Sequence, residues 1–185
     1  LRVIHPSFME VQNLPKEANL PRLLVQNSVT GCTVMINRAL KDLALPFPQK
    51  AVFHDWWLAL LAIAAGHIAY VDKATLYYRQ HGKNSVGAGG DFSLASLKKL
   101  FSFRRNLLSI EALFHQGDEL VNRLKERQIC FFRVEENLSV LKKGKIKRMY
   151  ELGIGKSGTL KNILFYGYLL WYIYSIGGGF HEECN

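Results

Sequence analysis

Residues 55–65 read DWWLALLAIAA, and in a helical conformation this stretch is apolar on nearly every face. Such a helix cannot lie on a protein surface, because it has no polar stripe to present to water. Gly66 follows directly and is typical of a residue that ends a helix. The rest of the chain must enclose this helix. With 185 residues, of which 49% are hydrophobic, it is long and apolar enough to do so.

Short apolar runs on both sides of this helix predict strands. They are rich in β-branched or aromatic residues and cover 32–36, 67–71 and 75–79. Asn37 can cap a short helix between the first run and the prolines at 46 and 48. Residues 1–90 therefore read as an α/β unit that ends in a glycine-rich loop.

The chain after residue 90 has the pattern of amphipathic helices. We expect one helix to about residue 115, a break at 116–118 and a second helix over 119–141. The apolar, aromatic stretch 163–176 predicts a last helix. The sequence thus predicts two parts: an α/β part over 1–90 and a basic, mainly α-helical extension over 91–185.

Positive charge is concentrated in the helical part. The formal net charge is +9, and residues 98–161 alone hold 15 basic and 7 acidic side chains. Such a block indicates an anionic partner. The aromatic residues do not interleave with the basic ones and no nucleic-acid-binding motif is visible, so we expect no nucleic-acid partner. The three cysteines are widely spaced and predict reduced thiols in the cytoplasm.

The basic run 141–148 and the aromatic stretch 163–176 together suggest how the anionic partner is reached. A helix of 14 residues is about 21 Å long, too short to cross a hydrocarbon core of about 30 Å. Its tyrosines and Trp171 are residue types that settle at the membrane boundary. We therefore expect residues 142–176 to bind an anionic membrane surface. The alternative is a tail that packs on its own domain or on another subunit of a homo-oligomer.

Asp55 is the most conspicuous candidate for chemistry. A carboxylate at the start of an apolar helix is commonly a helix cap, which satisfies amides of the first turn. It can equally be a general base at the mouth of a pocket, with the indoles of Trp56 and Trp57 as an apolar wall. The two interpretations are compatible, because the start of a helix can direct a carboxylate into a cleft.

Two other segments offer polar groups. Thr30 and the backbone beside Gly31 can bind a polyhydroxylated ligand, although a plain turn explains them as well, and Cys32 reads as a small buried residue. Arg79 can contact an anion, and His81 can contact a metal or a pyrophosphate. A surface imidazole is the simpler explanation of His81. The glycines of 82–90 and 153–158 fit neither a Walker A loop nor a dinucleotide fingerprint.

Four ordered blocks carry a family resemblance. They are NSVTGCTVMINRAL at 27–40, LALPFP at 43–48, HDWWLALLAIAAGHIAYVD at 54–72 and YRQHGKNSVGA at 78–88. In order and spacing the chain resembles bacterial family-2 glycosyltransferases, especially the rhamnosyltransferase-like members that build surface polysaccharides. The resemblance implies an α/β fold, the C-terminal half of a GT-A nucleotide-diphospho-sugar transferase, followed by the helical tail.

The resemblance also implies roles for residues. Asp55 would be the general base of an inverting transfer to a saccharide or lipid-linked acceptor. His81 would help to hold a divalent metal, Mg²⁺ or Mn²⁺, or the diphosphate of the donor. The substrate-binding positions would be Thr30, Gly31, Cys32, His54, Trp56, Trp57 and Arg79. The enzyme would be peripheral, on the cytoplasmic face of the bacterial membrane.

One departure from the family pattern is clear. The chain has no Asp-x-Asp or Glu-x-Asp motif, which in the family lies in an N-terminal nucleotide-binding half. We therefore expect a C-terminal piece whose metal needs ligands from that half, and which alone binds nucleotide sugar poorly and does not turn over. The alternative function is a non-catalytic membrane-surface or protein-interaction module. A metal-dependent hydrolase would need more ligands than His54, Asp55 and His81.

Overall fold

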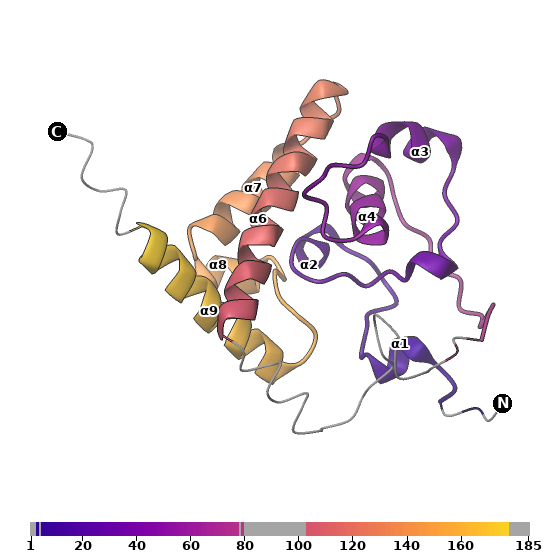
Figure 1. The fold of residues 1–185 in the computed structure, drawn as a ribbon, viewed down its shortest axis with the longest axis horizontal. Helices are drawn as coiled ribbons and strands as arrows, with labels where there is room; N and C mark the ends of the chain where they lie inside the picture. The colour runs from indigo at the N-terminus through magenta and orange to yellow at the C-terminus, as the bar shows by residue number, and fades with distance from the viewer. Residues whose placement is uncertain (1–2, 4, 78, 80–102, 178–185) are drawn as a thin grey trace.

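The computed structural model describes residues 3, 5–77, 79 and 103–177, and these form helices and loops, with no strand among them (Figure 1). The elements follow the chain in the order α1 (Phe8–Val11), α2 (Leu20–Leu23), the 3₁₀ helix η1 (Gly31–Thr33), α3 (Arg38–Ala44), α4 (His54–Ala65), α6 (Phe103–Glu126), α7 (Phe132–Lys142), α8 (Ile146–Glu151) and α9 (Thr159–Gly177).

The predicted α/β fold is wrong. Part of the run 32–36 belongs to η1, and the residues after it are extended without pairing; 67–71 and 75–77 contain no strand. β-branched residues form a strand only where another strand receives their backbone hydrogen bonds. The described residues offer no such partner. The helical architecture therefore contradicts the expected half of a GT-A fold.

Helix α4 is the centre of the N-terminal part, as its all-round apolar sequence predicts. Trp57, Leu60 and Leu61 are at most 1% exposed, and α2 and α3 pack against the helix. Figure 1 shows α4 surrounded by the N-terminal segments. The prediction for α3 is confirmed as well, because the side chain of Asn37 accepts a hydrogen bond from the N–H of Leu40.

Helix α6 runs without interruption through the predicted break at 116–118. Gly117 lies within α6. Leu138 of α7 occupies the space that a Cβ atom would need, which explains why the residue is glycine. Gln116 is buried, and its Oε1 accepts a 2.9 Å hydrogen bond from the N–H of Val52. Gly117 and Gln116 therefore do not form a turn. Gly117 contacts α7, and Gln116 contacts the segment before α4.

Arg123 of α6 connects residues 5–77 to the C-terminal helices α6–α9. Its guanidinium donates to the carbonyl of Leu43 over 2.7 Å and to that of Pro46 over 2.8 Å, and lies 5.7 Å from the centre of the Trp57 ring. The buried residues of both parts belong to one core cluster. The predicted boundary at residue 90 lies outside the described residues.

Helix α9 is the predicted tail helix, extended at its start by four residues, and it packs along α6 (Figure 1). Phe165 and Leu169 are buried in the contact, and the ring of Tyr172 meets Phe114 edge-on with 5.6 Å between centroids. No helix of the described chain is long and apolar enough to cross a membrane.

Candidate functional site

Asp55 lies in the first turn of α4, one residue after the helix begins. The N-cap position belongs to Phe53, which makes no side-chain capping bond. The Oδ1 atom of Asp55 accepts a 2.7 Å hydrogen bond from the N–H of Trp56. The carboxylate thus satisfies one amide of the first turn, although Asp55 is not the cap residue.

The same carboxylate binds a loop far away in the sequence. Nδ2 of Asn27 donates to Oδ1 over 3.0 Å, and the N–H of Gly31 donates to Oδ2 over 2.9 Å. The Oδ1 of Asn27 in turn accepts the N–H of Val29 over 2.9 Å, which folds the loop upon itself. The half-buried Asp55 therefore joins the loop 27–31 to the start of α4.

Gly31 lies close to the side chains of His54 and Asp55. A Cβ atom at this position would be 2.7 Å from Nε2 of His54 and 3.3 Å from Oδ2 of Asp55. The close approach brings together Asn27, Thr30, Gly31, His54 and Asp55, which we call the carboxylate cluster. Four of these five residues were predicted site residues. No role is predicted for Asn27 from the sequence. Asparagine side chains nevertheless commonly accept a hydrogen bond from the N–H two residues later, as Asn27 does from Val29.

The other predicted substrate-binding residues lie in different surroundings. Cys32 is exposed, and the expectation of a buried thiol is wrong. Trp56 is 7% exposed and its Nε1 donates to the carbonyl of Leu23; Trp57 is fully buried and its Nε1 donates to that of Ala44. Both indoles belong to the core in this structure, and their part in an acceptor pocket stays a prediction.

Arg79 is exposed, and His81 lies outside the described residues. The described residues contain no group of three or more histidine, cysteine, aspartate or glutamate side chains that could hold a metal ion. A hollow of about 350 Å³ is lined by Ile36, Asn37, Arg38 and Lys41, and Asp55 does not line it.

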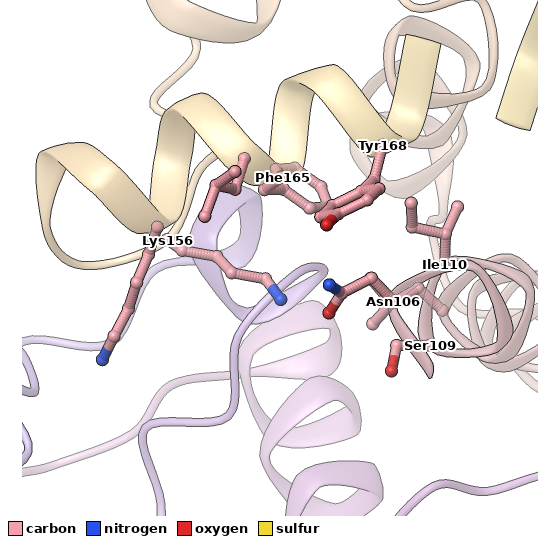
Figure 2. Close-up of a pocket in the computed structure, with 9 residues that line it drawn as sticks. Asn106, Ser109, Ile110, Lys156, Phe165 and Tyr168 are labelled. Carbon is pink, nitrogen blue, oxygen red and sulfur yellow. The ribbon is translucent and has the colours of Figure 1, made fainter. Parts of the chain in front are cut away.

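A second polar region lies between α6 and α9. Figure 2 shows Lys156, Phe165 and Tyr168 on one side of a pocket and Asn106, Ser109 and Ile110 on the other. Its volume is about 110 Å³. Nζ of Lys156 lies 5.2 Å from the centre of the Phe165 ring.

Burial lowers the pKa of Lys156, and the charge of Lys161 lowers it further. The loop that carries Lys156 is held on both sides. The N–H of Lys156 donates to Asn162, and the N–H of Ser157 donates to Gln26. The glycines of this loop match no phosphate-binding motif, and no other signal in the sequence predicts the pocket.

Comparisons with known proteins identify no relative: no protein-family model, curated protein or solved structure matches the chain. The resemblance to family-2 glycosyltransferases therefore stays a prediction that depends on the four sequence blocks.

Proposed function

We propose that this chain supplies the acceptor-activating base of a bacterial glycosyltransferase, and that the base is Asp55. The observation that carries the proposal is the carboxylate cluster. The N–H of Gly31, 24 positions earlier in the chain, donates to Oδ2 of Asp55, and the side-chain amide of Asn27 donates to Oδ1. A fixed carboxylate that is still half-exposed is the arrangement a positioned base requires.

The lone pairs of Asp55 leave room for a substrate. Oδ1 accepts from Asn27 and Trp56, whereas Oδ2 accepts from Gly31 alone among the described donors. A carboxylate offers about four acceptor sites. A sugar hydroxyl can therefore donate to Oδ2 without displacing a protein hydrogen bond.

The chemistry needs one such base. The hydroxyl oxygen of the acceptor attacks the anomeric carbon of a nucleotide-diphospho-sugar, with rhamnose as one expected sugar, and inverts it. The bond from that carbon to the diphosphate oxygen breaks, and the hydroxyl proton passes to Oδ2 of Asp55. The imidazole of His54 lies near the same point beside Gly31 as Oδ2 of Asp55 and offers a polar group to a polyhydroxylated acceptor.

The expected divalent ion remains part of the proposal. The described residues do not provide a three-ligand site for it, and the proton transfer at Asp55 does not involve it. Mg²⁺ or Mn²⁺ would neutralise charge on the leaving diphosphate when bound.

The second candidate function is a non-catalytic module in which Asp55 only fastens the loop to α4. The observation in its favour is that Asn27, Gly31 and Trp56 together donate three hydrogen bonds to the Asp55 carboxylate, an arrangement that a purely structural role explains. This alternative predicts that any substitution that breaks the bond between residues 27 and 55 has the same effect.

A pair of variants separates the two functions. Asp55→Asn and Asn27→Ala would be introduced into the gene in its bacterial host, with Asp42→Asn on α3 as a matched surface control. If Asp55 is the base, Asp55→Asn lowers surface-polysaccharide synthesis by at least about a hundredfold at normal protein abundance, whereas Asn27→Ala lowers it by no more than about tenfold, because the carboxylate that takes the proton is still present but less firmly held. Equal losses that follow the thermal stability of the two variants, or normal synthesis with Asp55→Asn, would overturn the proposal.

A further inference from the structure

Helix α9 has two faces of different kinds. Phe165 and Leu169 are buried against α6. On the opposite side lie Leu160, Ile163, Gly167, Trp171 and Tyr174, which we call the outward stripe. The spacing of three, four, four and three residues places them along one line of the helix. Their side chains are well exposed, 61% for Ile163 and 77% for Tyr174, and none is charged.

A turn rich in lysine lies against the flank of this helix. A Cβ atom on Gly144 would be 3.0 Å from Cδ1 of Ile173 and 3.1 Å from Cδ2 of Leu170. The backbone around Gly144 therefore contacts α9 directly. Leu170 lies between the buried face and the outward stripe, so the turn borders the stripe.

Three cations of this turn have no acidic partner among the described residues. Lys143, Lys145 and Lys147 are exposed and form no ion pair there, and we call them the lysine turn. Their neighbours differ, since Lys142 pairs with Asp118, and Arg148 pairs with Glu136 and Glu151. The structure thus leaves a net positive rim beside an uncharged, aromatic stripe.

These two features together select one occupant. A second copy of this chain would bring two lysine turns into the same interface, where like charges repel. A nucleic acid would leave the apolar stripe without a partner. An anionic bilayer satisfies both, because tryptophan and tyrosine settle at its boundary and lysines attract its headgroups.

We infer that α9 lies flat on an anionic membrane, with the outward stripe in the headgroup region and the lysine turn against the lipid phosphates. This narrows the surface expected from the sequence. The hydroxyl of Tyr166 donates inward to the carbonyl of Ile154, and Tyr172 packs on Phe114, so Trp171 and Tyr174 are the outward aromatic residues. The biological role of this membrane contact rests on the proposed function, since a lipid-linked acceptor lies in that membrane. The contact itself is tested by vesicle binding, without an assay of sugar transfer.

The experiment uses the full chain and vesicles of phosphatidylcholine with or without phosphatidylglycerol. We expect cosedimentation and a blue shift of tryptophan emission with the anionic vesicles only, weakening as salt is raised. Trp56 and Trp57 are buried, so Trp171 reports the contact. The triple variant K143Q/K145Q/K147Q should bind roughly a hundredfold more weakly, at about fivefold per lysine.

Matched controls keep the outcomes separate. K41Q/K50Q/K73Q removes the same charge from the N-terminal part and should bind as the parent does. Ile163→Ser combined with Tyr174→Ser should lose binding while circular dichroism and the thermal midpoint stay unchanged, because both side chains are exposed. Absent vesicle binding by the parent, equal binding by both lysine variants, or a dimer that this stripe variant converts to a monomer would overturn the inference. Asp55→Asn should bind vesicles normally, so failure of the inference and failure of the proposed function are distinguishable.

Discussion

The backbone N–H of Gly31 donates to Oδ2 of Asp55 over 2.9 Å, and this bond joins the start of η1 to the first turn of α4. It is the shortest connection between the two sequence blocks that were expected to form a site. A Cβ atom at residue 31 would lie 2.7 Å from Nε2 of His54, so a larger residue here requires the exposed imidazole to turn away.

Gly31→Ala should destabilise the protein by about 1 kcal/mol, because the exposed imidazole of His54 can turn away from the new methyl group while the 3.3 Å approach to Oδ2 of Asp55 remains. The measurement is the free energy of unfolding in urea. The double variant Gly31→Ala with His54→Ala removes the imidazole from the contact and should recover part of the loss. A Gly31→Ala protein as stable as the parent would contradict the close approach.

Gly117→Ala and Gly167→Ala form a matched pair in two long helices. Alanine favours a helix over glycine by about 1 kcal/mol, and a Cβ atom on Gly167 meets nothing within 4 Å. Gly167→Ala should therefore stabilise the protein, whereas Gly117→Ala collides with Leu138 and should destabilise it by about 1–3 kcal/mol. Thermal unfolding of both variants checks the opposite signs; a gain for Gly117→Ala would show that α6 and α7 do not approach as described.

Arg123→Ala should lower the free energy of unfolding by about 1–3 kcal/mol, because the hydrogen bonds to the carbonyls of Leu43 and Pro46 and the cation–π contact with Trp57 are lost together. Arg127→Ala is the control, since its side chain donates a single 3.2 Å bond to the carbonyl of Asp42. Denaturant midpoints compare the two. Equal effects would mean that the guanidinium of Arg123 contributes no more than a surface cation.

Lys156 gives a pH dependence whose sign follows from its pKa. Burial holds the folded-state pKa below the usual 10.5, so the folded protein binds fewer protons than the unfolded chain between that lowered value and 10.5. This group therefore destabilises the fold at neutral pH and ceases to do so as the pH rises through the window. As the pH rises over this range, the free energy of unfolding of the parent should increase relative to that of Lys156→Met. Lys161→Met should reduce the gain, because one cause of the lowered pKa is removed.

Local signals predicted the elements that depend on local physics. The apolar run 55–65, the cap at Asn37 and the aromatic tail each became the expected helix, since periodicity and capping act within a few residues. The strands were wrong because a β-branched run contains no information about whether another strand will pair with it. Gly117 was misread for the same reason: the leucine that explains it lies 21 positions later, in another helix.

The candidate site was predictable in its residues but not in its geometry. Asp55, His54 and Gly31 could be singled out from the sequence, yet nothing in it showed that Asn27 would hold the carboxylate. The indoles of Trp56 and Trp57 looked like ligand-binding groups because large aromatic residues serve both cores and pockets. The choice between these roles depends on the ends of α2 and α3, whose carbonyls accept hydrogen bonds from the two indole N–H groups.

The long helix α6 contacts α4, α7 and α9, and through Arg123 it also binds the end of α3 and the loop after it. If α4, α7 or α9 separated from α6, residues that are buried in that contact would become exposed to water. Melting should thus be concerted, with a single calorimetric transition whose enthalpy matches the van't Hoff value, and amides of α4 and α6 should exchange their hydrogens at the same global rate.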